Sequence, residues 1–344
     1  MGQHFNSPQL QQDLFQFIRE KHNIPKDKIL TNQLIQLFGV TKSTVYRWHR
    51  GEVLLKFSDV VKLVQHFGVS LDQFVYPKGR TLLFDFPNLN NPITSLDDYL
   101  KPIAENLNHL AAIPNSRVDY ISREIPIFHY FRYPELMAFK AFIWGKTMWE
   151  FSDFDGIRKF NLSQIKGVER YRTDILDSYN QISGIEVWGT NSLEITFNQI
   201  EYYLQMGMFD DPREALVLSR QLRSLMDHLY QLATRRKKII TGENWETSAD
   251  FTLYYSELSP SNNFLIAQSD TYNRAFVTID NLHTIQSEDP QLLQFMDRWK
   301  RTLRKQSELI TADSDKKQNK FFNDAEIKLV AFDRKVSNYV GRMR

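Results

Sequence analysis

One short segment constrains the fold of this chain more than any other, because two helical patterns meet there across a glycine. Leu34, Leu37 and Phe38 recur at helical spacing over residues 31–38. Gly39 follows at once, and glycine tolerates the positive φ that commonly ends a helix. The segment predicts a short helix that stops in a tight turn.

A second helical pattern begins directly after this turn, over residues 42–50. Thr41 can cap its N-terminus through the hydroxyl, and Gly51 stops it. Val45 and Trp48 are three positions apart and share one face, which we expect to be turned inward. The outward side chains are then Lys42, Ser43, Tyr46, Arg47 and Arg50.

These residues carry a resemblance to a known family. The run LIQLFGVTKSTVYRWHRG resembles the helix-turn-helix of Cro/cI-type (XRE-like) transcriptional regulators, and FSDVVKLVQHFGVSLDQFV is similar to the two helices that normally follow. The resemblance covers residues 31–76. In the second run Gly68 is expected to end one helix, and Ser70 with Gln73 forms a capping box for the next. Ile35 stands where the family usually has Ala or Gly, which implies a wider helix crossing.

The resemblance implies that the helix after the turn lies in the major groove of double-stranded DNA. It assigns base reading to Lys42, Ser43, Tyr46 and Arg47. Phosphate contacts are expected from five other residues, of which the first two would present a helix N-terminus: Thr31, Asn32, Thr44, Arg50 and Lys56. Lysine or arginine in the reading set favours guanine, whose N7 and O6 both accept hydrogen bonds.

The distribution of charge agrees with this interpretation. Residues 1–80 hold 11 Lys or Arg and 6 Asp or Glu, a net charge of +5 in a chain whose total is +2. Positive charge gathered on one part of a chain favours contact with phosphates. The alternative is an ordinary helical bundle whose basic side chains are simply solvated.

The remaining composition argues against several classes of protein. The 344 residues include no cysteine, which excludes disulfides, thiolate metal sites and cysteine nucleophiles. The chain lacks the P-loop, dinucleotide-binding, nucleophile-elbow and HExxH motifs, so we expect no enzyme activity, no cofactor and no metal. It also lacks a basic-then-apolar leader and an apolar run of membrane length, which predicts a cytoplasmic protein without a membrane partner.

The chain is expected to be α+β overall and to form two domains. An all-α helix-turn-helix domain over residues 1–79 is followed by a linker, residues 80–94, and by a larger α+β domain over residues 95–344. Ser95 can cap the first helix of the larger domain. The apolar residues of that helix alternate at spacings of four and three, which fits either a dimer seam or a domain core: Leu96, Leu100, Ile103, Leu107 and Leu110.

The rest of the larger domain mixes helical and β-rich patterns. The aromatic residues 125–149 fit strands or a buried mixed element, and a helix that starts at Asp211 is expected to end in a solvated basic run, residues 235–238. Residues 311–320 are expected to form a mobile loop before a final helix. Three β-rich runs predict an antiparallel meander, segregated along the chain from the helices: residues 251–258, 262–268 and 273–279.

Together with the resemblance, these features predict a sequence-specific DNA-binding transcription regulator. A homodimer is expected, because a two-fold dimer reads two half-sites of an operator. A small-molecule effector, held by the aromatic residues of the larger domain, is a further candidate partner. Two alternatives remain open: a protein-interaction adaptor built on the helical head, and an enzyme in the second domain that the head targets to DNA.

Overall fold

The computed structural model describes residues 6–22, 24–25, 27–71, 82–238, 248–257, 262–280, 283–311 and 315–342. The chain divides into two compact units, Met1–Leu83 and Phe84–Arg344. Asp85 forms backbone hydrogen bonds with Gln286 of the second unit. The C-terminal part of the expected linker, residues 80–94, therefore belongs to the second unit.

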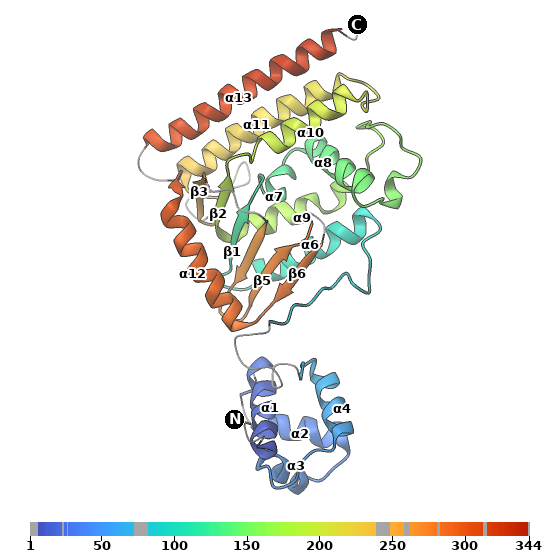
Figure 1. Ribbon diagram of the computed structural model, residues 1–344, viewed down its shortest axis with the longest axis vertical. Helices are drawn as coiled ribbons and strands as arrows, with labels where there is room; N and C mark the ends of the chain where they lie inside the picture. Colours follow the sequence, from blue (N-terminus) through green and yellow to red (C-terminus); the bar gives the residue numbers. More distant parts are fainter. Residues whose placement is uncertain are drawn as a thin grey trace, which may run out of the picture. The chain divides into compact units, whose positions relative to one another are not determined.

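The described part of the first unit consists of helices: α1 (Ser7–Lys21), α2 (Asp27–Phe38), α3 (Lys42–His49) and α4 (Phe57–Phe67) (Figure 1). Gly39 and Gly68 have φ values of +67° and +57° and follow α2 and α4, as the sequence predicts. The helices share one core, which contains Leu14, Phe15, Ile18, Leu30, Leu34, Val45, Trp48, Leu63 and Phe67. The capping box expected at Ser70 and Gln73 extends outside the described residues.

The second unit is built on a mixed seven-stranded sheet with the order β6-β5-β4-β1-β2-β3-β7. The central strands β1, β2 and β3 run parallel, and the outer pairings are antiparallel. The strands are β1 (Arg117–Ser122), β2 (Ser183–Gly189), β3 (Phe251–Ser256), β4 (Phe264–Gln268), β5 (Asn273–Thr278), β6 (Thr284–Ser287) and β7 (Glu308–Leu309).

Helices cover both faces of this sheet (Figure 1). One face supports the larger core, to which α6 (Leu96–Ala111), α7 (Ile127–Tyr130), α8 (Pro134–Thr147), α9 (Val168–Gln181), α10 (Glu194–Gln205), α11 (Glu214–Arg235) and α13 (Asp315–Arg342) contribute, with the 3-10 turn η1 (Ser152–Phe154). On the other face, α12 (Pro290–Gln306) packs Leu303 against Ile185 and Val187 of β2. The unit is thus three layered, with the parallel strands at its centre.

The sheet corrects two expectations about strand order. The meander consists of β4, β5 and β6, whereas the run at residues 251–258 forms β3 and pairs in parallel with β2. The expected segregation of helices and strands is also wrong, because α7, α8 and α9 lie between β1 and β2, and α10 and α11 between β2 and β3. Parallel neighbours require such crossover connections.

The helix that begins after Ser95 belongs to the core. The Ser95 hydroxyl accepts a hydrogen bond from the Asp98 amide at 3.1 Å, which confirms the predicted cap. α6 packs on α9 and buries Leu96, Leu100, Leu107 and Leu110 in the main core. Of the two alternatives for this pattern, the structure favours the core over a dimer seam.

Two segments of the second unit differ from their sequence-based interpretation. The expected mobile loop at residues 311–320 is wrong from Asp315 onward, because α13 begins there and Gln318 is already buried. The aromatic residues 125–149 form α7 and α8, whose side chains are core residues. Among the described helices none is both long enough and apolar enough to span a bilayer.

Candidate nucleic-acid interface

The candidate interface is the outer side of α3, and its orientation is fixed by two buried residues. Val45 and Trp48 lie in the core of the first unit, where the Trp48 ring meets Phe38 edge to face at 5.4 Å. This confirms the inward face predicted from their spacing. The opposite side of the helix is exposed and carries Lys42, Ser43, Tyr46 and Arg47, followed by Arg50 at the C-cap.

The start of α3 is capped as the sequence predicts. The Thr41 hydroxyl accepts a hydrogen bond from the Thr44 amide at 3.3 Å and lies 3.0 Å from the Thr44 hydroxyl. The preceding Gly39 provides the positive φ of the turn from α2. As a result Lys42 and Ser43 occupy the exposed first turn of α3, and Thr44 is half-buried.

A buried glutamine fixes the other end of α3. The Gln11 side chain of α1 is only 8% exposed. Its amide nitrogen donates to the carbonyls of Trp48 at 2.7 Å and Val53 at 3.0 Å, and its oxygen accepts from the Leu55 amide at 2.7 Å. Gln11 thus joins α1, the end of α3 and the loop that leads to Lys56.

Sequence reasoning missed Gln11, although a signal was present. Position 11 precedes Leu14, Phe15 and Ile18 at the spacing of one helix face, so it falls on the buried side of α1. A glutamine on such a face must find hydrogen-bond partners, because an unsatisfied buried amide is costly. The backbone of the loop after α3 supplies them.

The basic residues of α3 and its C-cap differ in the contacts that their side chains form. Arg50 forms two hydrogen bonds to the Glu52 carboxylate, at 2.6 and 3.2 Å. These bonds raise the pKa of Arg50 and lower that of Glu52. Arg47 lies 3.8 Å from the same carboxylate, and the Lys42 ammonium lies 5.5 Å from the centre of the Tyr46 ring. The exposed ion pairs of Arg47 and Arg50 with Glu52 are weak. Both guanidinium groups can therefore leave Glu52 and bind an outside anion.

Lys56 lies at the N-cap of α4, beyond the loop that Gln11 holds. Its side chain is exposed. Between Thr41 and Lys56 the chain has four basic residues and one acidic residue, so this stretch carries a net charge of +3 with histidine neutral. The exposed side of α3 and the following loop therefore form one positive surface.

The expected phosphate contacts at Thr31 and Asn32 are corrected by the structure. α2 begins at Asp27, one turn earlier than expected, because Leu30 belongs with Leu34 to its buried stripe. Thr31 is fully buried, and its hydroxyl donates to the Asp27 carbonyl at 2.7 Å. Asn32 is exposed but lies in the second turn, so neither residue presents a helix N-terminus.

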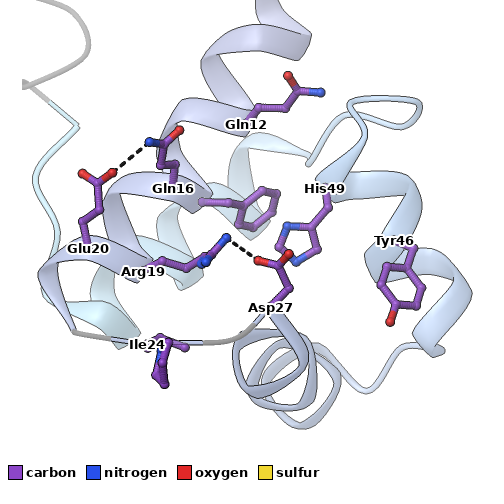
Figure 2. A pocket seen from close by; sticks show the side chains of 10 residues that line it. Gln12, Gln16, Arg19, Glu20, Ile24, Asp27, Tyr46 and His49 are labelled. Carbon is purple, nitrogen blue, oxygen red and sulfur yellow. Dashed lines mark hydrogen bonds and ion pairs between the residues drawn. The ribbon is translucent and has the colours of Figure 1, made fainter.

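A groove of about 780 Å³ separates α1 from α3 next to this surface (Figure 2). Tyr46 lines it, as does His49, whose ring centre lies 4.6 Å from that of Phe15. Burial lowers the pKa of His49, and the nearby Asp27 opposes this shift. His49 thus faces α1 as a neutral imidazole at pH 7 and is not part of the outward positive surface.

A second set of polar residues converges inside the second unit, on the carboxylate of Glu186 in β2. His129 donates to it at 2.9 Å, Trp188 donates at 2.8 Å, and the Tyr179 hydroxyl donates as well. The Lys238 ammonium lies 3.5 Å from the centre of the Tyr179 ring. Burial alone would raise the pKa of Glu186, but His129, Lys238 and Tyr179 together lower it.

This cluster is enclosed. Its position is relevant to the alternative in which the second domain is an enzyme. All five of its side chains are buried, and they line neither the groove beside α3 nor the hollow beside α13 described below. Across the described residues, no three His, Cys, Asp or Glu side chains are placed to hold a metal ion. The cluster joins β2 to α7 and α9 and acts as an internal hydrogen-bond network. It also corrects the interpretation of residues 235–238 as a solvated run, because Lys238 is fully buried.

The chain matches no protein-family model, no curated protein and no solved structure. The residues of the candidate interface therefore carry the functional assignment.

Proposed function

We propose that this protein is a sequence-specific DNA-binding transcription regulator that acts as a homodimer and inserts α3 into the major groove. The observation that carries the proposal is the exposed side of α3, which presents Lys42, Ser43, Tyr46 and Arg47 while Val45 and Trp48 anchor the helix from behind. A rigid helix with cationic and hydrogen-bonding side chains on its free face suits direct reading of base edges.

The neighbouring residues support a separate role in positioning. Thr44 lies beside the reading residues within α3, and Arg50 and Lys56 follow them. We assign these three residues to phosphate contacts, which position a protein without reading sequence. The Gln11 bonds keep the loop that bears Lys56 in a fixed place relative to α3. A protein built this way gains affinity from the loop and specificity from the helix.

The experiment that tests the proposal is selection of bound DNA from a random pool by the full chain. An inverted repeat with guanine in each half-site is expected. On the recovered site, Arg47→Ala should lower affinity about 5- to 150-fold and relax the preference at one position. Lys56→Ala should weaken all sequences alike and reduce the salt dependence by about one released ion.

The matched control is Lys159→Ala, which removes one exposed positive charge from the second unit. It should leave binding and its salt dependence unchanged. Recovery of unselected sequences, or equal effects of the Arg47 and Lys159 variants, would reject the proposed function.

A further inference from the structure

The helix α13 is 28 residues long and is packed on one side only. It contacts α11, α10 and β7 within the second unit, and its opposite side is exposed (Figure 1). The buried side holds Ala325, Leu329, Phe332, Val336 and Val340. A helix of this length with one free side has room for a second helix.

The exposed side of α13 has the spacing of a helix–helix seam. Six exposed residues follow one another at alternating steps of four and three positions: Lys320, Asp324, Ile327, Ala331, Arg334 and Asn338. The centre is apolar, since Ile327 is 67% exposed and its neighbour Val330 is 43% exposed. We call these six residues, with Val330, the α13 seam.

Asp324 and Arg334, an acid and a base of the α13 seam, are placed symmetrically about its apolar centre. Lys328 and Lys335, on the flanks, form ion pairs with Glu194 and Glu201 of α10. Asp324 and Arg334 form no ion pair within the described part of the chain. They lie five positions before and five positions after Leu329. When such a helix is reversed, its acid and its base exchange places.

A hollow of about 310 Å³ lies beside Asp324, between α13 and the ends of β2 and β3. Its lining has more carboxylates than ammonium groups, and two aromatic rings form part of its wall, so it favours a flat cation such as a guanidinium. The charged lining residues are Glu194, Glu257, Glu308, Asp324, Lys320 and Lys328, and the rings are Tyr255 and Phe321.

We infer that α13 pairs antiparallel with α13 of a second copy of this chain, about a two-fold axis that passes beside Leu329. Residues equally distant from position 329 then meet, so the partner's Arg334 lies beside Asp324 in the acidic hollow, and the partner's Ala331 lies against Ile327. Symmetry repeats each contact, and each copy donates and receives one arginine. The inference rests on the proposed function and names the surface that forms its dimer.

The α13 seam presents a matching acid and base when the helix is reversed. This symmetry favours a second copy of this chain over an unrelated partner. Each seam supplies both the acid and the base that the other requires, in one register, and the small Ala331 faces the large Ile327. From Lys320 to Asn338 the overlap is about 27 Å long at 1.5 Å per residue. The seam first expected in α6 is buried in its own core, so that helix is not free to pair with a second copy.

Charge reversal in the full chain tests the pairing, with the dimer dissociation constant measured by sedimentation over a concentration series. Asp324→Arg sets two arginines against each other, and Arg334→Asp sets two aspartates against each other. Each single variant should raise the dissociation constant about 10-fold or more, because like charges are then juxtaposed. The double variant, Asp324→Arg with Arg334→Asp, should restore it.

Two exposed residues of the second unit, Asp155 and Arg158, supply matched controls. Asp155→Arg and Arg158→Asp change the net charge by the same amounts and should leave the dissociation constant unaltered. A chain that stays monomeric at every concentration would overturn the inference. So would a dimer that the single swaps at positions 324 and 334 do not weaken, or a double variant that does not recover.

The register can be tested separately, because the chain has no cysteine of its own. Chains with Asp324→Cys and chains with Arg334→Cys should form a disulfide when mixed and oxidised, whereas either chain alone should not, since its thiols are about 15 Å apart along the axis. Cross-linking of the Asp324→Cys chain with itself would indicate a parallel pairing and overturn the inference.

These outcomes are independent of the test of DNA binding. If the swaps dissociate the dimer but no sequence is recovered from the random pool, the pairing stands and the proposed function fails. If an operator is recovered while the swaps leave the mass unchanged, the function stands and the pairing fails.

Discussion

The candidate interface of the first unit and the core of the second unit hold positive charge in opposite ways. In the first unit Lys42, Arg47 and Lys56 are exposed around α3. In the second unit Lys140 and Lys300 are buried, with Nζ at 2.8 Å from Glu124 and 2.5 Å from Asp119, respectively. Exposed cations remain available to an outside anion, whereas buried ones are already neutralised and serve the fold.

The role of a basic residue thus depends on the helix face or strand that carries it. The run at residues 235–238 is the most basic in the chain, yet Lys237 pairs with Asp250 at 2.7 Å and Lys238 is enclosed. The shorter set on α3 is exposed because Val45 and Trp48 orient the helix. Three measurements test this contrast.

The largest effect is expected at the enclosed network. Glu186→Leu removes the carboxylate that accepts from His129 and Trp188, and leaves Lys238 without its compensating charge. Breaking a buried ion pair from one side typically costs about 3–5 kcal/mol. The free energy of unfolding of the full chain, followed in urea by circular dichroism, should fall by this amount.

Glu105→Leu is the control for this measurement, because Glu105 is exposed on α6. Its effect should stay within about 0.5 kcal/mol. Equal losses in the two variants would show that the buried carboxylate does not stabilise the unit more than a surface one.

A smaller effect is expected in the first unit from Gln11→Ala, which leaves the Trp48 and Val53 carbonyls and the Leu55 amide without their partner. Such a loss costs about 1–3 kcal/mol. Hydrogen exchange at the Leu55 amide should accelerate, and affinity for all DNA sequences should fall together. Gln16→Ala, on the exposed side of α1, is the control and should change neither.

The smallest effect concerns pH. Burial lowers the pKa of Lys238 to about 8 from its ordinary value of 10.5, and Glu186 opposes this shift. Between these values the unfolded chain binds more protons than the folded chain, so the stability contributed by this group rises with pH. The gain is about 1 kcal/mol from pH 8 to pH 9. It should appear in urea titrations of the wild type and vanish in Lys238→Met; an identical pH dependence in both would assign it to other groups.

Local rules predict part of this structure correctly. Thr41 and Ser95 cap their helices, and Gly39 and Gly68 follow helix ends with positive φ. Each of these features depends on a hydrogen bond or a backbone angle within four residues. The outward side of α3 could be predicted for the same reason, because it follows from the spacing of Val45 and Trp48.

Features that depend on distant residues could not be predicted in this way. β1 and β2 pair Val118 with Gly184 across one crossover that contains α7, α8 and α9, and β3 pairs with β2 and not with β4, which follows it directly in the sequence. The burial of Lys238 depends on Tyr179 and Glu186, which lie on other elements. The hydrogen bonds of Gln11 could not be predicted, because its partners lie more than 35 positions away along the chain.

The ends of the sheet have a consequence for how copies of this chain behave at high concentration. β7 is two residues long, and at the opposite end Asp85 bridges to Gln286 of β6. Across the described strands, little free backbone is left along either border to template a strand from a neighbouring molecule. Ordered growth into fibrils by strand addition is therefore disfavoured, and a concentrated solution of the folded protein should resist this form of polymerisation.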